Sequence, residues 1–242
     1  MTRFLFPPIF WVALLLALAV LGMEKAEPFF HWVFPDIKRV IYTRTSFSIL
    51  LAYHFIIVAT SSLISIAIGV GAGIFVTRQA GQDFLPIVRT IAAVGQTFPP
   101  IAVLGIAILL VGYGSAPILI ALIIYGLLPI VENTIAGLAA VPPSVVEAAK
   151  AMGYSSIERL IFIELPLASP VILAGIRVSI IINIGTATIG STVGARTLGA
   201  PIIEGLAGSN TAYIIQGAIV VGLFAIFFDM ALGYLARRLP QI

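Results

Sequence analysis

The sequence predicts an all-α polytopic membrane protein with about six transmembrane helices. Of its 242 residues, 60% are hydrophobic and only 10% are charged, which exceeds what a soluble core requires. Apolar segments bounded by Gly, Pro or charged residues recur along the chain, and each is long enough to cross a bilayer as a helix, for which roughly 17 to 25 residues suffice. The chain has no cysteine, so thiol catalysis, disulfides and cysteine-ligated metals are excluded.

Six spans are expected in order along the chain. They are Phe6–Gly22, Phe47–Val76, Leu85–Val111, Ala116–Leu138, Pro170–Ile189 and Tyr213–Leu235. We expect the first to be retained as a membrane span, and the second is long enough to tilt in the bilayer or to protrude from it.

An even number of spans places both ends of the chain on one side of the membrane. Cytoplasmic loops carry an excess of Lys and Arg, which favours a cytoplasmic location for both termini and for the segment 141–167. The basic residues then expected inside are Arg3, Arg78, Arg89, Lys150, Arg159, Arg177, Arg237 and Arg238, and those expected outside are Lys25, Lys38, Arg39, Arg44 and Arg196. The net charge of +3 suits anionic lipid and gives no reason to expect nucleic acid as a partner.

The segment 141–167 is a polar interruption of the apolar pattern. Ser144 and Glu147 have the spacing of a capping box, in which each side chain bonds a free backbone N–H at a helix start. Gly153 is expected to end this short helix, because glycine readily adopts the left-handed conformation found at helix C-termini.

A second helix is expected directly afterwards. Ser155 and Glu158 repeat the capping-box spacing, and the helix should run toward Glu164 before Pro166 interrupts it or begins a new first turn. The segment is therefore predicted to be a helix–turn–helix outside the bilayer. Small residues at its turn would let the backbone of another protein approach closely: Ala148, Ala149, Ala151 and Gly153.

This segment resembles the cytoplasmic signature of the membrane-spanning permease subunits of ABC importers. That signature is Glu-Ala-Ala, three residues, Gly, nine residues, then Ile-x-Leu-Pro. The residues that match it are Glu147, Ala148, Ala149, Gly153, Ile163, Leu165 and Pro166. In that family the segment docks on the ATPase, so the resemblance implies that these residues couple the chain to ATP hydrolysis.

The resemblance also implies a fold, a set of partners and a location. It implies the type I ABC importer permease fold, with residues 1–242 forming a single permease domain whose core covers about 46–236. The implied partners are an ABC ATPase dimer, a second permease subunit, identical or paralogous, and an extracytoplasmic substrate-binding protein. The implied location is the bacterial cytoplasmic (inner) membrane, as a multi-pass protein.

The chain itself is not expected to be an enzyme. It contains no Gly-x-x-x-x-Gly-Lys-Ser/Thr phosphate-binding loop, so ATP and Mg²⁺ are expected on the partner ATPase and no cofactor or catalytic residue on this chain. His31 and His54 are far apart in sequence, which makes a metal site unexpected. Gly69 and Gly73 lie in an apolar segment, where this spacing is typical of a helix-packing face and not of a dinucleotide site.

A narrower resemblance, from about Ser46 to Leu235, is to the osmoprotectant branch of ABC importers, which takes up glycine betaine, choline and carnitine. It is carried by the runs Thr90–Pro100, Leu165–Arg177, Ile182–Ile189, Gly199–Ile203 and Gln216–Ala218. It implies import of a quaternary ammonium compound by alternating access. The alternatives are an ABC importer for another small solute such as an amino acid, a stand-alone secondary transporter, and a membrane scaffold.

Polar residues and prolines within the third and fifth spans are candidates for lining the transport pathway. They are Gln96, Thr97, Pro99, Pro100, Asn183, Thr186 and Thr188. Adjacent prolines leave backbone carbonyls without a helical partner, which membrane helices tolerate where protein or a cavity satisfies them. The alternative is that the Ser and Thr side chains hold helices together.

Overall fold

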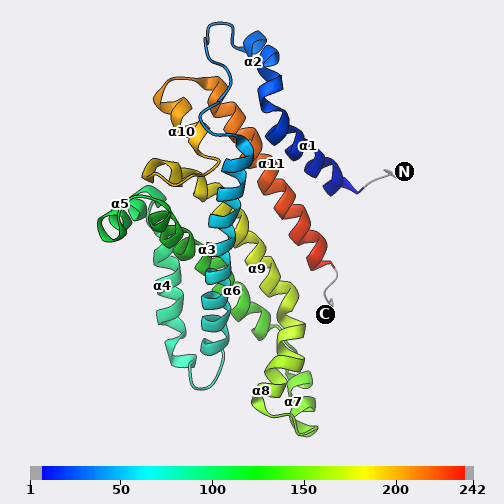
Figure 1. Cartoon of the computed structure of the whole chain (residues 1–242). Helices are drawn as coiled ribbons and strands as arrows, with labels where there is room; N and C mark the ends of the chain where they lie inside the picture. The colour runs from blue at the N-terminus through cyan, green and yellow to red at the C-terminus, as the bar shows by residue number, and fades with distance from the viewer. Residues whose placement is uncertain (1–6, 238–242) are drawn as a thin grey trace. The chain divides into compact units, whose positions relative to one another are not determined.

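The computed structural model describes residues 7–237, and within that range all regular structure is helical (Figure 1). The α-helices are α1 (Pro8–Gly22), α2 (Glu27–Val33), α3 (Phe47–Val76), α4 (Leu85–Thr97), α5 (Pro100–Val111), α6 (Ser115–Ala139), α7 (Pro143–Ala151), α8 (Ser156–Arg159), α9 (Leu165–Thr186), α10 (Ala200–Ala207) and α11 (Thr211–Ala236). Short 3-10 segments cover Met23–Ala26, Gln82–Phe84 and Ala187–Val193, and a π-helical turn covers Leu160–Glu164. Arg3, Phe6 and Arg238, which entered the sequence prediction, lie outside the described residues.

The described residues contain five helical stretches that are long and apolar enough to cross a membrane. They are Pro8–Val33, Phe47–Val76, Ser115–Ala139, Ser156–Val193 and Thr211–Ala236. A sixth is counted if α4 and α5 together form one broken span. The prediction of an all-helical protein with about six spans is thereby confirmed, and α3 has the expected bounds.

The expected span Leu85–Val111 is broken between α4 and α5, which are bent by 99° relative to one another. Phe98 and Pro99 both adopt extended backbone conformations, with ψ of 138° and 133°. Each precedes a proline, and a following proline disfavours the helical conformation of the residue before it. Pro100 then occupies the first position of α5, where its missing N–H costs nothing.

The expected bounds of the fifth span are also wrong at both ends. Pro170 lies inside α9 and does not begin it, since the helical stretch already starts at Ser156. At the other end the α-helix stops at Thr186 and continues as the 3-10 segment Ala187–Val193. Gly194, with φ of +84°, closes that segment in the left-handed conformation.

The chain forms two compact units that alternate along the sequence. The first unit contains the described residues up to Ser61 together with 99–122 and 181–231. The second unit contains 62–98, 123–180 and the described residues from Leu232 onward. Helices α3, α6, α9 and α11 therefore contribute residues to both units.

In the first unit, Gln216 of α11 holds the loop that precedes α3. Its Oε1 accepts a hydrogen bond from the Tyr42 N–H (3.1 Å), and its Nε2 donates to the carbonyl of Val40. Gln216 and Val40 are fully buried. The amide thus satisfies backbone groups that a buried loop would otherwise leave without partners.

In the second unit, α3 and α6 pack closely through glycine. A Cβ on Gly69 would lie 2.8 Å from the Ile130 side chain, and one on Gly73 would lie 2.6 Å from that of Thr134. The predicted helix-packing role of these glycines is confirmed. A cluster of buried side chains continues this contact to α4: Val76, Ala92, Val131 and Ile135.

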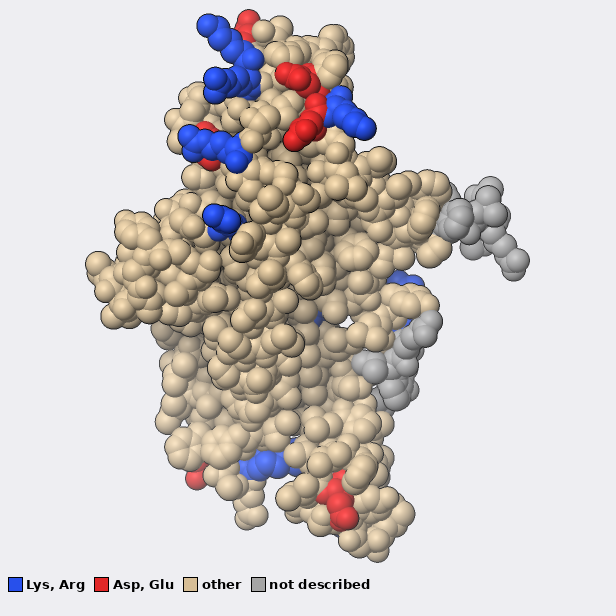
Figure 2. All heavy atoms as spheres, viewed as in Figure 1, with Lys and Arg blue, Asp and Glu red and all other residues tan. Residues whose placement is uncertain are grey.

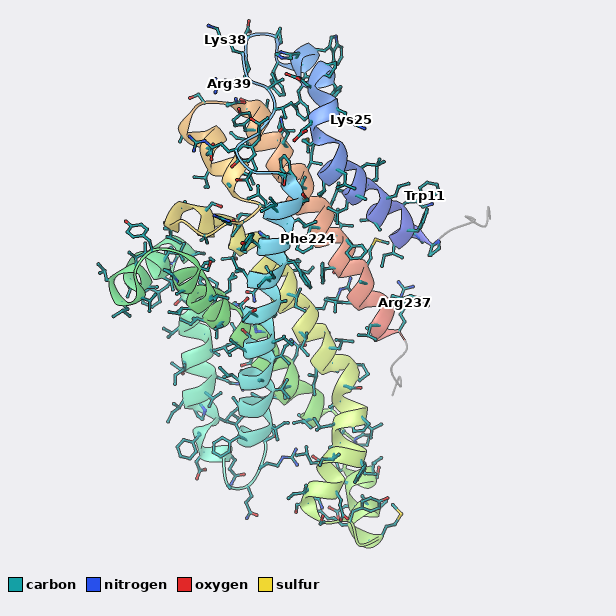
Figure 3. All side chains as sticks on the ribbon, in the orientation of Figure 1. Trp11, Lys25, Lys38, Arg39, Phe224 and Arg237 are labelled. Atoms are coloured by element: carbon teal, nitrogen blue, oxygen red, sulfur yellow. The ribbon has the colours of Figure 1, made fainter. Side chains whose placement is uncertain are left out.

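Many charged side chains of the first unit gather at one end of it. Figure 2 shows them around α2, the following loop and α10, and Lys38 and Arg39 project outward from that loop in Figure 3. In the second unit the charged side chains are more widely spread, and Arg89 of α4 forms an ion pair with Glu132 of α6. The helices also carry exposed apolar side chains such as Leu63 and Leu109, as expected of a lipid-facing surface.

Candidate functional site

The docking segment, residues 141–167, begins with a helix whose predicted cap is wrong. Helix α7 starts at Pro143 after Pro142, so Ser144 lies inside its first turn and makes no capping hydrogen bond. Proline suits this position because its fixed φ is helical and its absent N–H would have no partner there. Glu147 instead accepts a hydrogen bond from Lys150 Nζ at 2.7 Å, and this contact holds the pKa of the Glu147 carboxyl below its usual range.

The turn after α7 has the predicted left-handed glycine. Gly153 has φ of +85°, its N–H donates to the carbonyl of Lys150 (3.0 Å), and the N–H of Tyr154 donates to that of Ala149 (3.1 Å). This pair of bonds is the Schellman motif, which satisfies the last carbonyls of a helix. The turn is therefore fixed by backbone geometry that favours glycine.

The second predicted capping box is confirmed. Ser155 Oγ accepts from the Glu158 N–H (3.3 Å), and Glu158 Oε2 accepts from the Ser155 N–H (2.9 Å). These hydrogen bonds lower the pKa of the Glu158 carboxyl. Helix α8 thus starts at Ser156, three positions after Gly153, which gives the expected helix–turn–helix (Figure 1).

The π-helical turn that follows α8 places a buried carboxylate between two arginines. The Glu164 side chain is 8% exposed, and its Oε2 lies 2.6 Å from Arg78 Nη1, while its Oε1 accepts from Arg159 Nε at 3.1 Å. Pro166 does not interrupt the helical stretch, because it occupies the first turn of α9. The ion pair between Glu164 and Arg78 was not predicted from the sequence. The available signal was a carboxylate within an apolar run.

The signature residues divide by exposure. Glu147, Ala148, Gly153 and Pro166 are exposed, Ala149 is buried, and Ile163 and Leu165 are half-buried. Large apolar side chains of the same segment are exposed as well: Met152, Ile157 and Phe162. An exposed apolar patch of this kind is typical of a protein-binding surface.

The pathway candidates in the second unit make hydrogen bonds within it. Gln96 Nε2 donates to the carbonyl of Tyr125 at 2.8 Å, which joins α4 to α6. Thr97 Oγ1 donates to the carbonyl of Val94 at 2.8 Å, within its own helix.

The pathway candidates in the first unit are divided between a pocket and the interior. Pro100 and Thr186 line a largely apolar pocket of about 480 Å³, together with Gly185 and isoleucines of α5, α9 and the 3-10 segment. Asn183 is fully buried, Thr188 Oγ1 donates to the carbonyl of Gly185 at 2.7 Å, and Pro99 precedes α5. The structure therefore brings Pro100 and Thr186 to one surface.

His54 is a packed residue of the first unit. It is fully buried, its Nδ1 accepts from the Leu198 N–H (3.2 Å), and its Nε2 lies 3.1 Å from the carbonyl of Ile184. Phe224 meets the imidazole edge to face with 5.8 Å between ring centroids. Among residues 7–237 no three His, Cys, Asp or Glu side chains are grouped so that they could hold a metal ion.

A second, polar pocket of the first unit was also missed by the sequence argument. It has a volume of about 360 Å³, and its lining includes Tyr42, Arg44, Arg196 and Glu204. Burial, and then the charge of Glu204, raise the pKa of Tyr42 to about 12. Tyr42 and Glu204 are so far apart along the chain that only the fold reveals this grouping.

Comparison with known proteins gives consistent matches over most of the chain. Residues 65–241 match the family described as binding-protein-dependent transport system inner membrane component. The osmoprotectant import permease protein OsmY of Salmonella typhimurium is 41% identical over 77% of this chain and 79% of its own length. The glycine betaine/carnitine/choline transport system permease protein OpuCD of Bacillus subtilis is 36% identical over 78% and 82%. A chain of the MetNI methionine ABC transporter, solved in inward-facing conformations, shares the fold with a TM-score of 0.69 at 21% identity, over 78% of this chain and 94% of that one.

Proposed function

Because this chain belongs to the family of binding-protein-dependent transport system inner membrane components, we propose that it imports a quaternary ammonium osmoprotectant of the glycine betaine, carnitine or choline type. The role of permease subunit in an ABC importer follows from the family itself. The substrate class is supported by the names of relatives: that from Salmonella typhimurium states osmoprotectant import, that from Bacillus subtilis glycine betaine, carnitine and choline transport, and that from Listeria monocytogenes carnitine transport.

The observation that carries the coupling role is the geometry of the docking segment. A Schellman turn at Gly153 and a capping box at Ser155 fix the connection between the short helices α7 and α8. Glu147, Ala148, Met152 and Ile157 of this segment are all exposed. A rigid, partly apolar knob of this kind suits a groove in an ATPase. On this proposal the signature residues make or support that contact.

The partners of an ABC importer permease include an ATPase and a permease. We propose that the ATPase is a dimer that binds ATP and Mg²⁺, that the second permease is identical or paralogous, and that an extracytoplasmic binding protein delivers the substrate. No cofactor is assigned to this chain. We propose that it crosses the bacterial inner membrane with both termini and the docking segment in the cytoplasm, in keeping with the Lys and Arg distribution. The family match covers parts of both compact units, which supports a single permease domain over 1–242.

The transport pathway is proposed to run past residues of the broken span. Pro100 and Thr186 line an apolar pocket, and Pro99 ends the regular helix before it. Gln96, Thr97, Asn183 and Thr188 remain candidates that would act by holding the surrounding helices in place. Alternating access moves such a surface between two openings, so the interrupted helix would provide the place where the backbone can change shape.

Two measurements test the proposal. Purification of the tagged chain from its native membrane in mild detergent should recover a P-loop ATPase and a permease partner. In proteoliposomes containing the recovered complex and its binding protein, uptake of labelled glycine betaine should be competed by unlabelled glycine betaine, carnitine or choline and not by amino acids. Competition by an amino acid alone would instead establish an importer of a different solute.

A further inference from the structure

The polar pocket of the first unit combines both signs of charge in a small space. Of its charged lining residues, Arg44 and Arg196 are cationic and Glu204 is anionic, so the guanidinium groups are in excess. The lining also includes the small residues Gly194, Ala195 and Ala200, which leave room between these groups. A pocket that presents guanidinium groups as well as a carboxylate suits a ligand that carries both charges.

The anionic side of the pocket is held in place by Tyr42. Glu204 Oε1 accepts a hydrogen bond from the Tyr42 hydroxyl at 3.2 Å and lies 3.4 Å from Arg44 Nη1. The Glu204 side chain is 32% exposed, so its carboxylate remains accessible to a ligand. A quaternary ammonium group has no N–H to donate, and it is attracted to such a carboxylate by charge alone.

The cationic side is formed by two guanidinium groups. Arg196 Cζ lies 5.4 Å from the centroid of the Tyr53 ring, a cation–π contact that orients its side chain. Arg44 is 77% exposed. A planar guanidinium binds a carboxylate through paired hydrogen bonds, so each arginine is a suitable partner for a carboxylate of a ligand.

We infer that this pocket is a permease site for a compact zwitterion, with the carboxylate of the ligand on Arg196 and Arg44 and its ammonium group against Glu204. The inference rests on the proposed function and narrows it. Glycine betaine and carnitine carry a carboxylate as well as the quaternary ammonium, whereas choline carries a hydroxyl in its place. The site therefore favours the zwitterionic osmoprotectants over choline.

The site lies on the face of the first unit that the proposed orientation places outside the cytoplasm. A substrate released from a binding protein would meet it there. The headgroup of phosphatidylethanolamine is also a compact zwitterion with an ammonium group, so the lipid composition must be controlled in any test.

The decisive experiment measures binding to the complete permease–ATPase complex without its binding protein, in nanodiscs of phosphatidylglycerol, by saturation-transfer NMR on the ligand methyl protons. Wild type is expected to bind glycine betaine at least tenfold more tightly than choline. Arg196→Gln is expected to weaken glycine betaine binding about tenfold and to leave choline unchanged, since it removes only a carboxylate partner. Glu204→Gln should weaken the binding of both ligands. Lys38→Gln changes an exposed residue of the loop that also carries Arg44, and it should affect the binding of neither ligand.

The other possible results contradict either the proposed site or the proposed substrate class. If Arg196→Gln weakens the binding of glycine betaine and choline equally, or if neither pocket variant weakens binding, the proposed site is wrong. The proposed function would still stand if the complex transports glycine betaine. Loss of glycine betaine binding on adding phosphatidylethanolamine shows that the headgroup is the occupant. A complex that hydrolyses ATP but imports no quaternary ammonium compound overturns the proposed substrate class. If Arg196→Gln does not assemble, Arg44→Gln tests the same contact.

Discussion

The carboxylate of Glu164 lies 2.6 Å from the guanidinium of Arg78, and this ion pair joins the docking segment to the end of α3 within the second unit. The Arg78 side chain is 30% exposed and the Glu164 side chain 8%, so the pair is largely removed from water. Arg159 supplies a second ion pair to the same carboxylate. The docking segment is therefore tied to the loop after α3 by a charged contact that is costly to separate.

Glu164→Gln is expected to loosen the docking segment and reduce coupling between ATP hydrolysis and uptake. Removing one partner of a buried ion pair costs about 3 kcal/mol, and here it leaves two arginines close together. Hydrogen exchange across 155–167 should rise, and the number of ATP molecules hydrolysed per substrate should increase. Glu147→Gln is the matched control for exchange, since its pair with Lys150 is exposed. Unchanged exchange in Glu164→Gln would contradict this role.

Gly153→Val should damage the docking turn and uncouple transport while membrane insertion is retained. No atom lies within 4 Å of the Cβ that a side chain would add, so the cost comes from the positive φ alone. For a residue with a Cβ this conformation costs about 1 to 2 kcal/mol. Gly153→Asn is the control, because Asn adopts the left-handed conformation more readily. Normal coupled uptake by the Val variant would count against the docking assignment.

Local sequence rules succeeded where one residue decides the conformation. The left-handed turn at Gly153 and the capping box at Ser155 and Glu158 depend only on neighbouring residues, and both are present. The same capping rule failed at Ser144, because Pro142 and Pro143 shift the helix start by two positions. Two helix-start signals competed there, and spacing alone could not rank them.

Contacts between distant residues could not be predicted from the sequence. The partner of Glu164 is 86 positions away at Arg78, and neither residue has a spacing that points to the other. The polar pocket likewise joins Tyr42 and Glu204 through the fold alone. Composition predicted the spans because a bilayer imposes length and polarity on each segment separately. It carries no information on which charged groups meet outside the membrane.

Gly73→Ala and Gly71→Ala should separate packing from helix propensity in α3. A Cβ at position 73 would lie 2.6 Å from the Thr134 side chain, whereas nothing lies within 4 Å of one at position 71. Overpacking typically costs about 1 to 3 kcal/mol, so the first variant should lower the thermal unfolding temperature of the purified protein in detergent. The second should be neutral or slightly stabilising, because Ala favours helix over Gly. Equal effects of the two changes would show that α3 and α6 do not pack through this face.

Ionisation of Tyr42 should destabilise the first unit at high pH. Its pKa is raised to about 12 by burial and, to a lesser extent, by Glu204, so the fold favours the neutral phenol over the phenolate. The resulting stabilisation is complete below pH 10, the ordinary pKa of tyrosine, and is lost as the pH rises from there to about 12. The difference in phenolate absorbance between wild type and Tyr42→Phe should titrate near pH 12. In a Glu204→Gln background the same difference should titrate lower yet remain above 10, because burial is the larger cause. Titration at the ordinary value in both backgrounds would show that Tyr42 is open to water.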